Sequence, residues 1–125
     1  MDKAKVAKIR WRPDAEEQDY PGAESFLSLL YSEERVAEIM SKLKRASIVQ
    51  FKAKDIFRAS QLSLLGVSSS HVEKDRIRIR KGKRLSPLLL VRDEHNRKVV
   101  IADGYHRLCA IYEFNEDAWI HCKII

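Results

Sequence analysis

The strongest constraint on the fold lies in the last third of the chain, where the hydrophobic pattern changes abruptly at Asp103-Gly104. Residues 98–102, KVVIA, form a short apolar run that is typical of a strand within a sheet. Residues 105–114, YHRLCAIYEF, follow at once with the spacing of an amphipathic helix. Its apolar side is predicted to contain Leu108, Ile111 and Tyr112. A strand is therefore predicted to end, and a helix to begin, at this junction.

Two further strands are predicted beside this junction. Residues 87–93, PLLLVRD, predict a strand, which the polar residues 94–97, EHNR, connect to residues 98–102 as a hairpin. Residues 118–125, AWIHCKII, predict a closing strand after the helix. The order strand, strand, helix, strand predicts an α/β (α+β) fold in which helices pack on a small mixed sheet.

The first third of the chain is predicted to add one strand and two helices. Residues 8–12, KIRWR, alternate basic and apolar side chains, which indicates an edge strand with Ile9 and Trp11 facing inward. A helix is predicted to begin at Pro21, and its apolar side to contain Phe26, Leu27, Leu29 and Leu30. A second helix is predicted from Ser32, whose hydroxyl can cap it. Its buried stripe is predicted to contain Val36, Ile39, Met40 and Leu43.

The middle of the chain has a less regular pattern. Residues 48–53, IVQFKA, predict a strand, and Asp55 is expected to cap a short turn after it. Residues 71–82, HVEKDRIRIRKG, predict a third helix that Ser69 or Ser70 caps and that Gly82 ends. The alternation within RIRIR is also typical of a strand, so the pattern leaves both alternatives open.

A chain of 125 residues is the length of one domain. We expect residues 1–47 to form an N-terminal extension and residues 48–125 to form the core. The apolar runs are too short to span a membrane, so a membrane is not expected as a partner. The N-terminus lacks the apolar segment of a secretory signal, and the chain has only two cysteines. These features predict a cytoplasmic protein.

The chemistry of the junction predicts a phosphate-binding site. The first amides of a helix lack partners within the helix, and the helix dipole adds positive charge at this end. Gly104 has no side chain that would obstruct a phosphate, and it can adopt backbone angles that other residues resist. His106 can donate a hydrogen bond to a phosphate oxygen, and Arg107 offers a planar set of donors that stays charged. Asp103 is expected either to cap the helix or to hold a Mg²⁺ ion that bridges it to the phosphates.

The sequence DGYHRLCAIYEF, preceded by LSPLLLVRD and KVVIA and followed by AWIHCKII, resembles the ParB/sulfiredoxin-like superfamily. Its Asp-Gly-x-His-Arg motif is most similar to the variant in DGQHR-domain proteins and, more loosely, in ParB-like free serine kinases. The resemblance covers residues 48–125 by the order of their elements. It implies that Gly104, Tyr105, His106 and Arg107 hold the phosphates of a nucleotide, ATP or CTP with Mg²⁺.

The resemblance implies further roles. In sulfiredoxins the helix before the Pro-led strand contributes phosphate contacts, which implies the same for His71, Lys74 and Arg78 here; their spacing places them on one side of a helix. Sulfiredoxins carry a catalytic cysteine where this chain has Tyr105, so sulfiredoxin activity is not expected. An enzyme of this kind would catalyse phosphoryl transfer or nucleotide hydrolysis, with Asp103 and His106 as candidate catalytic residues.

The charge of the chain favours anionic partners, because the formal net charge is +6 and the isoelectric point is about 9.4. An alternative function is therefore a non-catalytic DNA- or RNA-associated ParB-like binding module, or a nuclease-like protein. Such a module would use the same groove and residues 76–84, RIRIRKGKR, together with Lys8, Arg10 and Arg12. The other interpretation of these charges is a solvated surface.

Overall fold

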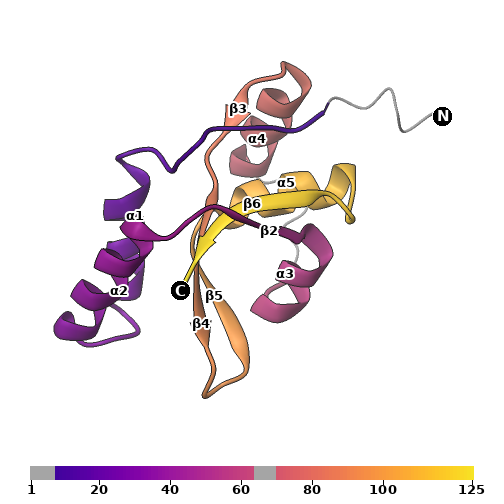
Figure 1. Cartoon of the computed structure of the whole chain (residues 1–125). Helices are drawn as coiled ribbons and strands as arrows, with labels where there is room; N and C mark the ends of the chain where they lie inside the picture. The colour runs from indigo at the N-terminus through magenta and orange to yellow at the C-terminus, as the bar shows by residue number, and fades with distance from the viewer. Residues whose placement is uncertain (1–7, 64–69) are drawn as a thin grey trace.

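A four-stranded mixed sheet lies at the centre of the protein (Figure 1). The structure is a computed structural model that describes residues 8–63 and 70–125. The strand order is β2 (Val49–Lys52), β6 (Trp119–Ile124), β4 (Leu88–Asp93) and β5 (Lys98–Asp103). β4 and β5 form an antiparallel hairpin, and β6 lies parallel to β4. The helix α5 (Tyr105–Phe114) connects β5 to β6 and makes this parallel pairing possible.

Both faces of this sheet are buried, as β4 illustrates. Leu88 and Leu90 belong to one hydrophobic core, whereas Leu89 and Val91 belong to another. Successive side chains of a strand point to opposite faces, so the two cores lie on opposite sides of the sheet. This explains why the sequence of β4 is a continuous apolar run rather than an alternation.

Helices cover each face of the sheet (Figure 1). One core joins the sheet to α3 (Ala53–Ser60), α4 (Ser70–Arg80) and α5. The other core joins it to α1 (Asp19–Leu27) and α2 (Glu33–Arg45). The fold is therefore α/β, with helices packed on a small mixed sheet, as the sequence predicted.

A second, two-stranded sheet brings the N-terminal strand to the middle of the chain. β1 (Arg10–Trp11) pairs in parallel with β3 (Arg84–Leu85). The Arg12 amide continues this pairing by donating to the Leu85 carbonyl at 2.8 Å. As a result, the segment that follows β1 lies beside the segment that leads into β4.

A buried lysine fastens the N-terminal segment to the central sheet. The side chain of Lys123 on β6 is only 3% exposed. Its Nζ atom donates to Asp14 Oδ1 at 3.1 Å, to the Tyr20 hydroxyl at 3.0 Å and to the Lys44 carbonyl at 2.9 Å. Burial alone would lower the pKa of Lys123, but the bonds to Tyr20 and Asp14 raise it above the ordinary value. The ammonium group is therefore charged and fully bonded.

Most of the predicted elements are confirmed. α5 spans the predicted residues 105–114, and both strands of the hairpin and the closing strand form. The RIRIR segment belongs to α4, so the strand alternative is wrong. Ser32 caps α2, because its Oγ accepts from the Arg35 amide at 3.2 Å. The predicted cap of α4 was Ser69 or Ser70: Ser70 is the first residue of the helix, and Ser69 lies outside the described residues. No helix of the described part is long and apolar enough to cross a membrane.

The prediction for the first helix was wrong in its boundaries and in its buried side. α1 begins at Asp19, before Pro21, and ends at Leu27. The chain then turns, so Leu29 and Leu30 are 81% and 51% exposed, and Phe26 is 42% exposed. Leu27 and the overlooked Ala23 are the buried residues of this helix. The prediction assumed that helical spacing continued to Leu30, but the chain turns directly after Leu27.

The capping role predicted for Asp55 is also wrong. α3 begins at Ala53, directly after β2, and Asp55 lies within its first turn, where it pairs with Arg58 at 3.0 Å. The first amides of the helix, those of Ala53 and Lys54, donate to carbonyls of the loop before β6, both at 2.9 Å. A side-chain cap is unnecessary because the backbone supplies these acceptors.

Candidate functional site

The junction between β5 and α5 depends on a glycine for steric reasons. Gly104 is the N-cap of α5 and has a φ of 107°, which side chains rarely adopt. A Cβ atom there would lie 2.7 Å from Leu88 Cγ and 2.8 Å from Arg107 Nη2. The positive φ confirms that this position needs backbone angles that other residues resist, and the Cβ contacts add a packing reason for glycine; access for a phosphate stays a prediction. The space beside Gly104 holds Leu88 and the Arg107 side chain.

Arg107 folds back over the start of its own helix. Its Nη2 atom donates to Asp103 Oδ2 at 2.8 Å and to the Pro87 carbonyl at 3.4 Å. The side chain is 15% exposed, and Nε is buried without a hydrogen-bond partner among the described residues. The guanidinium group is thus held at the positive end of α5, and its buried Nε donor has no partner among the described residues.

Asp103 does not cap α5, so that expectation is wrong. Burial raises the pKa of the Asp103 carboxyl group above its ordinary value, although the charge of Arg107 and its hydrogen bond act in the opposite direction. Within the described residues no group of three or more His, Cys, Asp or Glu side chains could hold a metal ion. Arg107 pairs with Asp103 Oδ2, so a Mg²⁺ ion bound to this carboxylate would compete with the ion pair.

Asp75 on α4 is a buried carboxylate that the sequence analysis missed. Its side chain is 8% exposed and pairs with Arg78 Nη1 at 3.0 Å. Burial raises the pKa of Asp75, and the charges of Arg107, Arg78 and His106 oppose this shift. Asp75 therefore lies where α4 faces the start of α5. The sequence feature that could have identified Asp75 as buried is its helical spacing from the other buried residues of α4, Val72, Arg76 and Ile79.

The remaining predicted residues are distributed around this contact between α4 and α5. The rings of His71 and His106 lie 4.8 Å apart. Burial, and next the charge of His71, lower the pKa of His106. The Tyr105 hydroxyl donates to the Ser63 carbonyl. Lys74 is exposed and forms no ion pair within the described residues. The structure thus brings His71 and Arg78 toward the junction but leaves Lys74 in solvent.

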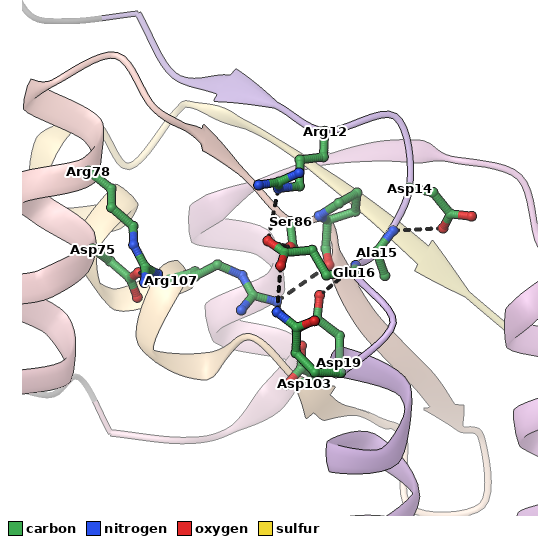
Figure 2. A network of polar contacts seen from close by, with 12 residues as sticks. Arg12, Asp14, Ala15, Glu16, Asp19, Asp75, Arg78, Ser86, Asp103 and Arg107 are labelled. Atoms are coloured by element: carbon green, nitrogen blue, oxygen red, sulfur yellow. Dashed lines mark hydrogen bonds and ion pairs between the residues drawn. The ribbon is translucent and has the colours of Figure 1, made fainter.

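A pocket of about 320 Å³ opens beside Arg107, and we call it the Arg107 pocket. Figure 2 shows Arg107 pointing away from α4 toward Asp103, with Arg12 and Glu16 nearby. The pocket is lined by Arg12, Glu16, Gln18, Asp19, Arg78, Lys83, Arg84, Leu85, Ser86 and Arg107. Five of these residues are cationic and two are acidic. Three of the cations, Arg12, Arg78 and Arg107, pair with carboxylates, so the remaining positive charge of the lining lies on Lys83 and Arg84.

The cationic side chains of the Arg107 pocket differ in how far they are neutralised. Arg12 Nε pairs with Glu16 Oε1 at 2.8 Å, and Ser86 Oγ donates to the same oxygen at 3.1 Å. A hydrogen bond from Gln18 is the main cause that lowers the pKa of Glu16. Lys83 and Arg84 form no ion pair with any described residue. The pocket therefore retains positive charge that an anion could neutralise.

The sequence identified only two residues of this pocket as phosphate ligands, Arg78 and Arg107. Arg12, Lys83 and Arg84 were noted only as members of basic runs. Glu16 and Ser86 were overlooked, because the β1–β3 pairing that brings residues 12–19 to residues 83–86 has no local signature.

Comparisons with protein-family models, with curated proteins and with solved structures find no match for this chain. The site must therefore be interpreted from its own chemistry.

Proposed function

We propose that this protein binds the phosphate groups of a nucleotide in the Arg107 pocket. The observation that supports the proposal is the lining of the pocket, in which five cations face two carboxylates. Lys83 and Arg84, which form no ion pair within residues 8–63 and 70–125, would neutralise a phosphate directly. The volume of about 320 Å³ lies at the lower end of ligand pockets, which span roughly 300–1,000 Å³. This size fits a phosphate chain better than a large apolar ligand.

The two arginines that the resemblance implied supply the fixed part of this site. Arg107 carries a buried, unpartnered Nε atom at the positive end of α5. Arg78 reaches the pocket from α4, where Asp75 holds it. The amides of Gly104, Tyr105 and His106, with His71 and Lys74, remain proposed contacts for the rest of the nucleotide. The proposed nucleotide is ATP or CTP, and its phosphates would supply most of the ligands of the accompanying Mg²⁺ ion.

The proposed ligand is compatible with phosphoryl transfer or nucleotide hydrolysis. Both reactions depend mainly on positioning and on neutralising the charge of the transferred group, which arginines perform. His106 has a lowered pKa, so its imidazole would be neutral near pH 7 and able to accept a proton. Asp103 is less suited to this role while Arg107 occupies it. The cytoplasm is the proposed compartment, in keeping with two buried cysteine thiols.

Nucleic-acid binding through the basic helix α4 receives less support. Arg76, Arg78 and Arg80 each pair with a carboxylate, on Glu113, Asp75 and Glu73 respectively. These arginines are partly neutralised within the protein, so α4 does not offer an unpaired basic face.

Calorimetric titration with ATP, CTP and GTP in the presence of Mg²⁺ tests the nucleotide proposal. We expect Arg107→Lys to weaken binding by about tenfold or more, because lysine cannot reproduce the planar set of donors. Lys83→Gln should weaken binding severalfold. The control is Arg45→Gln, a substitution that removes one positive charge at an exposed position on α2. Thermal unfolding followed by circular dichroism would establish that each variant folds. If none of the three nucleotides binds the wild-type protein, the proposal is wrong.

A further inference from the structure

A second pocket lies on the β1–β3 sheet and adjoins the Arg107 pocket. It has a volume of about 730 Å³, and we call it the β1–β3 groove. It is lined by Lys8, Ile9, Arg10, Trp11, Arg12, Pro13, Ile48, Arg84 and His121. Arg12 and Arg84 line both pockets, so the two are neighbours. Four of the lining residues are cationic and none is acidic.

The positive charge of the groove is concentrated by the strand register. Arg10 lies directly opposite Arg84 in the parallel pair of β1 and β3. Like charges at opposed positions of a sheet are unfavourable. Among the described residues, the Arg10 guanidinium donates only to the Gly82 carbonyl, at 3.2 Å, and Arg84 forms no ion pair. A polyanion bound across the groove would relieve this repulsion.

The groove also contains a pair of stacked aromatic rings. The Trp11 and His121 rings are 5.1 Å apart and nearly parallel, with an angle of 5° between their planes. Burial lowers the pKa of His121, so its ring is neutral near pH 7. Trp11 on β1 lies between Arg10 and Arg12, and His121 comes from β6. The lining of the groove thus combines two aromatic rings with four cationic side chains, and one of the rings comes from a strand that is distant in sequence.

We propose that the β1–β3 groove binds single-stranded nucleic acid. Lys8, Arg10 and Arg84 would contact successive phosphates, and a base would stack on the Trp11–His121 pair, as in other single-strand platforms. A single strand fits better than a duplex, because only unpaired bases can stack on protein rings. The proposal goes beyond nucleotide binding, since it uses residues outside the Arg107 pocket.

The charge contribution is tested with a fluorescently labelled oligothymidylate, whose binding to the full chain is followed by anisotropy at several salt concentrations. The test variant is Lys8→Gln/Arg10→Gln, which leaves every residue of the Arg107 pocket in place. The matched control is Arg45→Gln/Arg58→Gln, which removes two exposed arginines that do not line the groove.

Each phosphate contact to a single strand contributes about 0.7 to the slope of log affinity against log salt. The Lys8→Gln/Arg10→Gln variant should therefore lose about 1.4 of this slope and bind about tenfold or more weakly at low salt. The control should resemble the wild-type protein. Equal affinities of the two double variants would overturn the proposal. Because nucleotide titration of Lys8→Gln/Arg10→Gln should be unchanged, failure here and failure of the nucleotide site are distinguishable.

The stacking contribution is tested by fluorescence. The chain has two tryptophans, so Trp119→Phe leaves Trp11 as the single tryptophan, whose emission is followed. Saturable quenching of Trp11 by the oligothymidylate would support base stacking. Binding without quenching, or equal affinity for inorganic polyphosphate or for a duplex of the same charge, would overturn the assignment to single strands.

Discussion

Gly104 lies between β5 and α5, and the local sequence pattern explains only part of the need for a glycine there. The change from an apolar strand to a helical pattern marked it as the critical position in the sequence. The stated reasons were access for a phosphate, which stays a prediction, and unusual backbone angles, which the φ of 107° confirms; the structure adds that a Cβ atom would collide with Leu88 and Arg107. Packing from Leu88, on a neighbouring strand, is tertiary information that a local sequence pattern does not contain.

Replacing Gly104 with alanine should destabilise the fold strongly. The positive φ of 107° would cost about 1–3 kcal/mol, and the added Cβ would displace Leu88 or Arg107 at a similar further cost. Urea unfolding measures the change. Gly82→Ala is the control, because Gly82 also has a positive φ, 69°, but no atom within 4 Å of its Cβ position. That variant should lose only about 1–2 kcal/mol. Equal losses would show that packing at Gly104 is unimportant.

At the scale of elements, α4 explains why its sequence favoured two structures. Its buried stripe contains the charged residues Asp75 and Arg76 between Val72 and Ile79. Because the buried stripe is partly charged, the sequence lacks the apolar periodicity of an amphipathic helix. The RIRIR segment also has the alternating polar and apolar pattern of a strand. The charged residues are buried because α5 supplies partners: Arg76 Nε pairs with Glu113 Oε2 at 2.7 Å. The strands β4, β5 and β6 and the helix α5 were predictable because apolar residues occupy most of their buried positions.

The contact between α4 and α5 should make stability depend on pH through Asp75. Burial raises the pKa of Asp75 above 3.8, so the folded state binds more protons than the unfolded state between 3.8 and the raised value. This contribution to the free energy of unfolding is present at lower pH and is lost as pH rises through that window. Asp75→Asn should remove this loss. Urea unfolding of both proteins from pH 3.5 upward measures the difference.

The difference between the wild-type protein and Asp75→Asn isolates this group, because Asp103, whose pKa is also raised, is present in both. The two stability curves should converge at the acidic end and separate as pH rises. Parallel curves would mean that Arg78 and Arg107 fully compensate the burial of Asp75.

At the scale of the whole molecule, the candidate site is assembled from segments that are distant in sequence. Arg12 and Glu16 come from the N-terminal segment, Arg78 from α4, Ser86 from the segment before β4, and Arg107 from α5. The sequence predicted the elements of the last third of the fold and marked Arg107 as a candidate site residue, because both inferences depend on local patterns. It could not predict the pocket, because the β1–β3 pairing and the Lys123 contacts are long-range and involve few residues.

Lys123 should therefore be important for both stability and the site. Lys123→Met fills the same space but leaves the Tyr20 hydroxyl and the Lys44 carbonyl without their shared donor, which costs about 1–3 kcal/mol. Because Asp14 also loses this contact, the segment that carries Arg12 and Glu16 should loosen, and nucleotide affinity should fall with stability. Lys52→Met, at a more exposed lysine on β2, is the control for urea unfolding and for the titration. Unchanged affinity in a destabilised Lys123→Met protein would show that the N-terminal segment does not form part of the binding site.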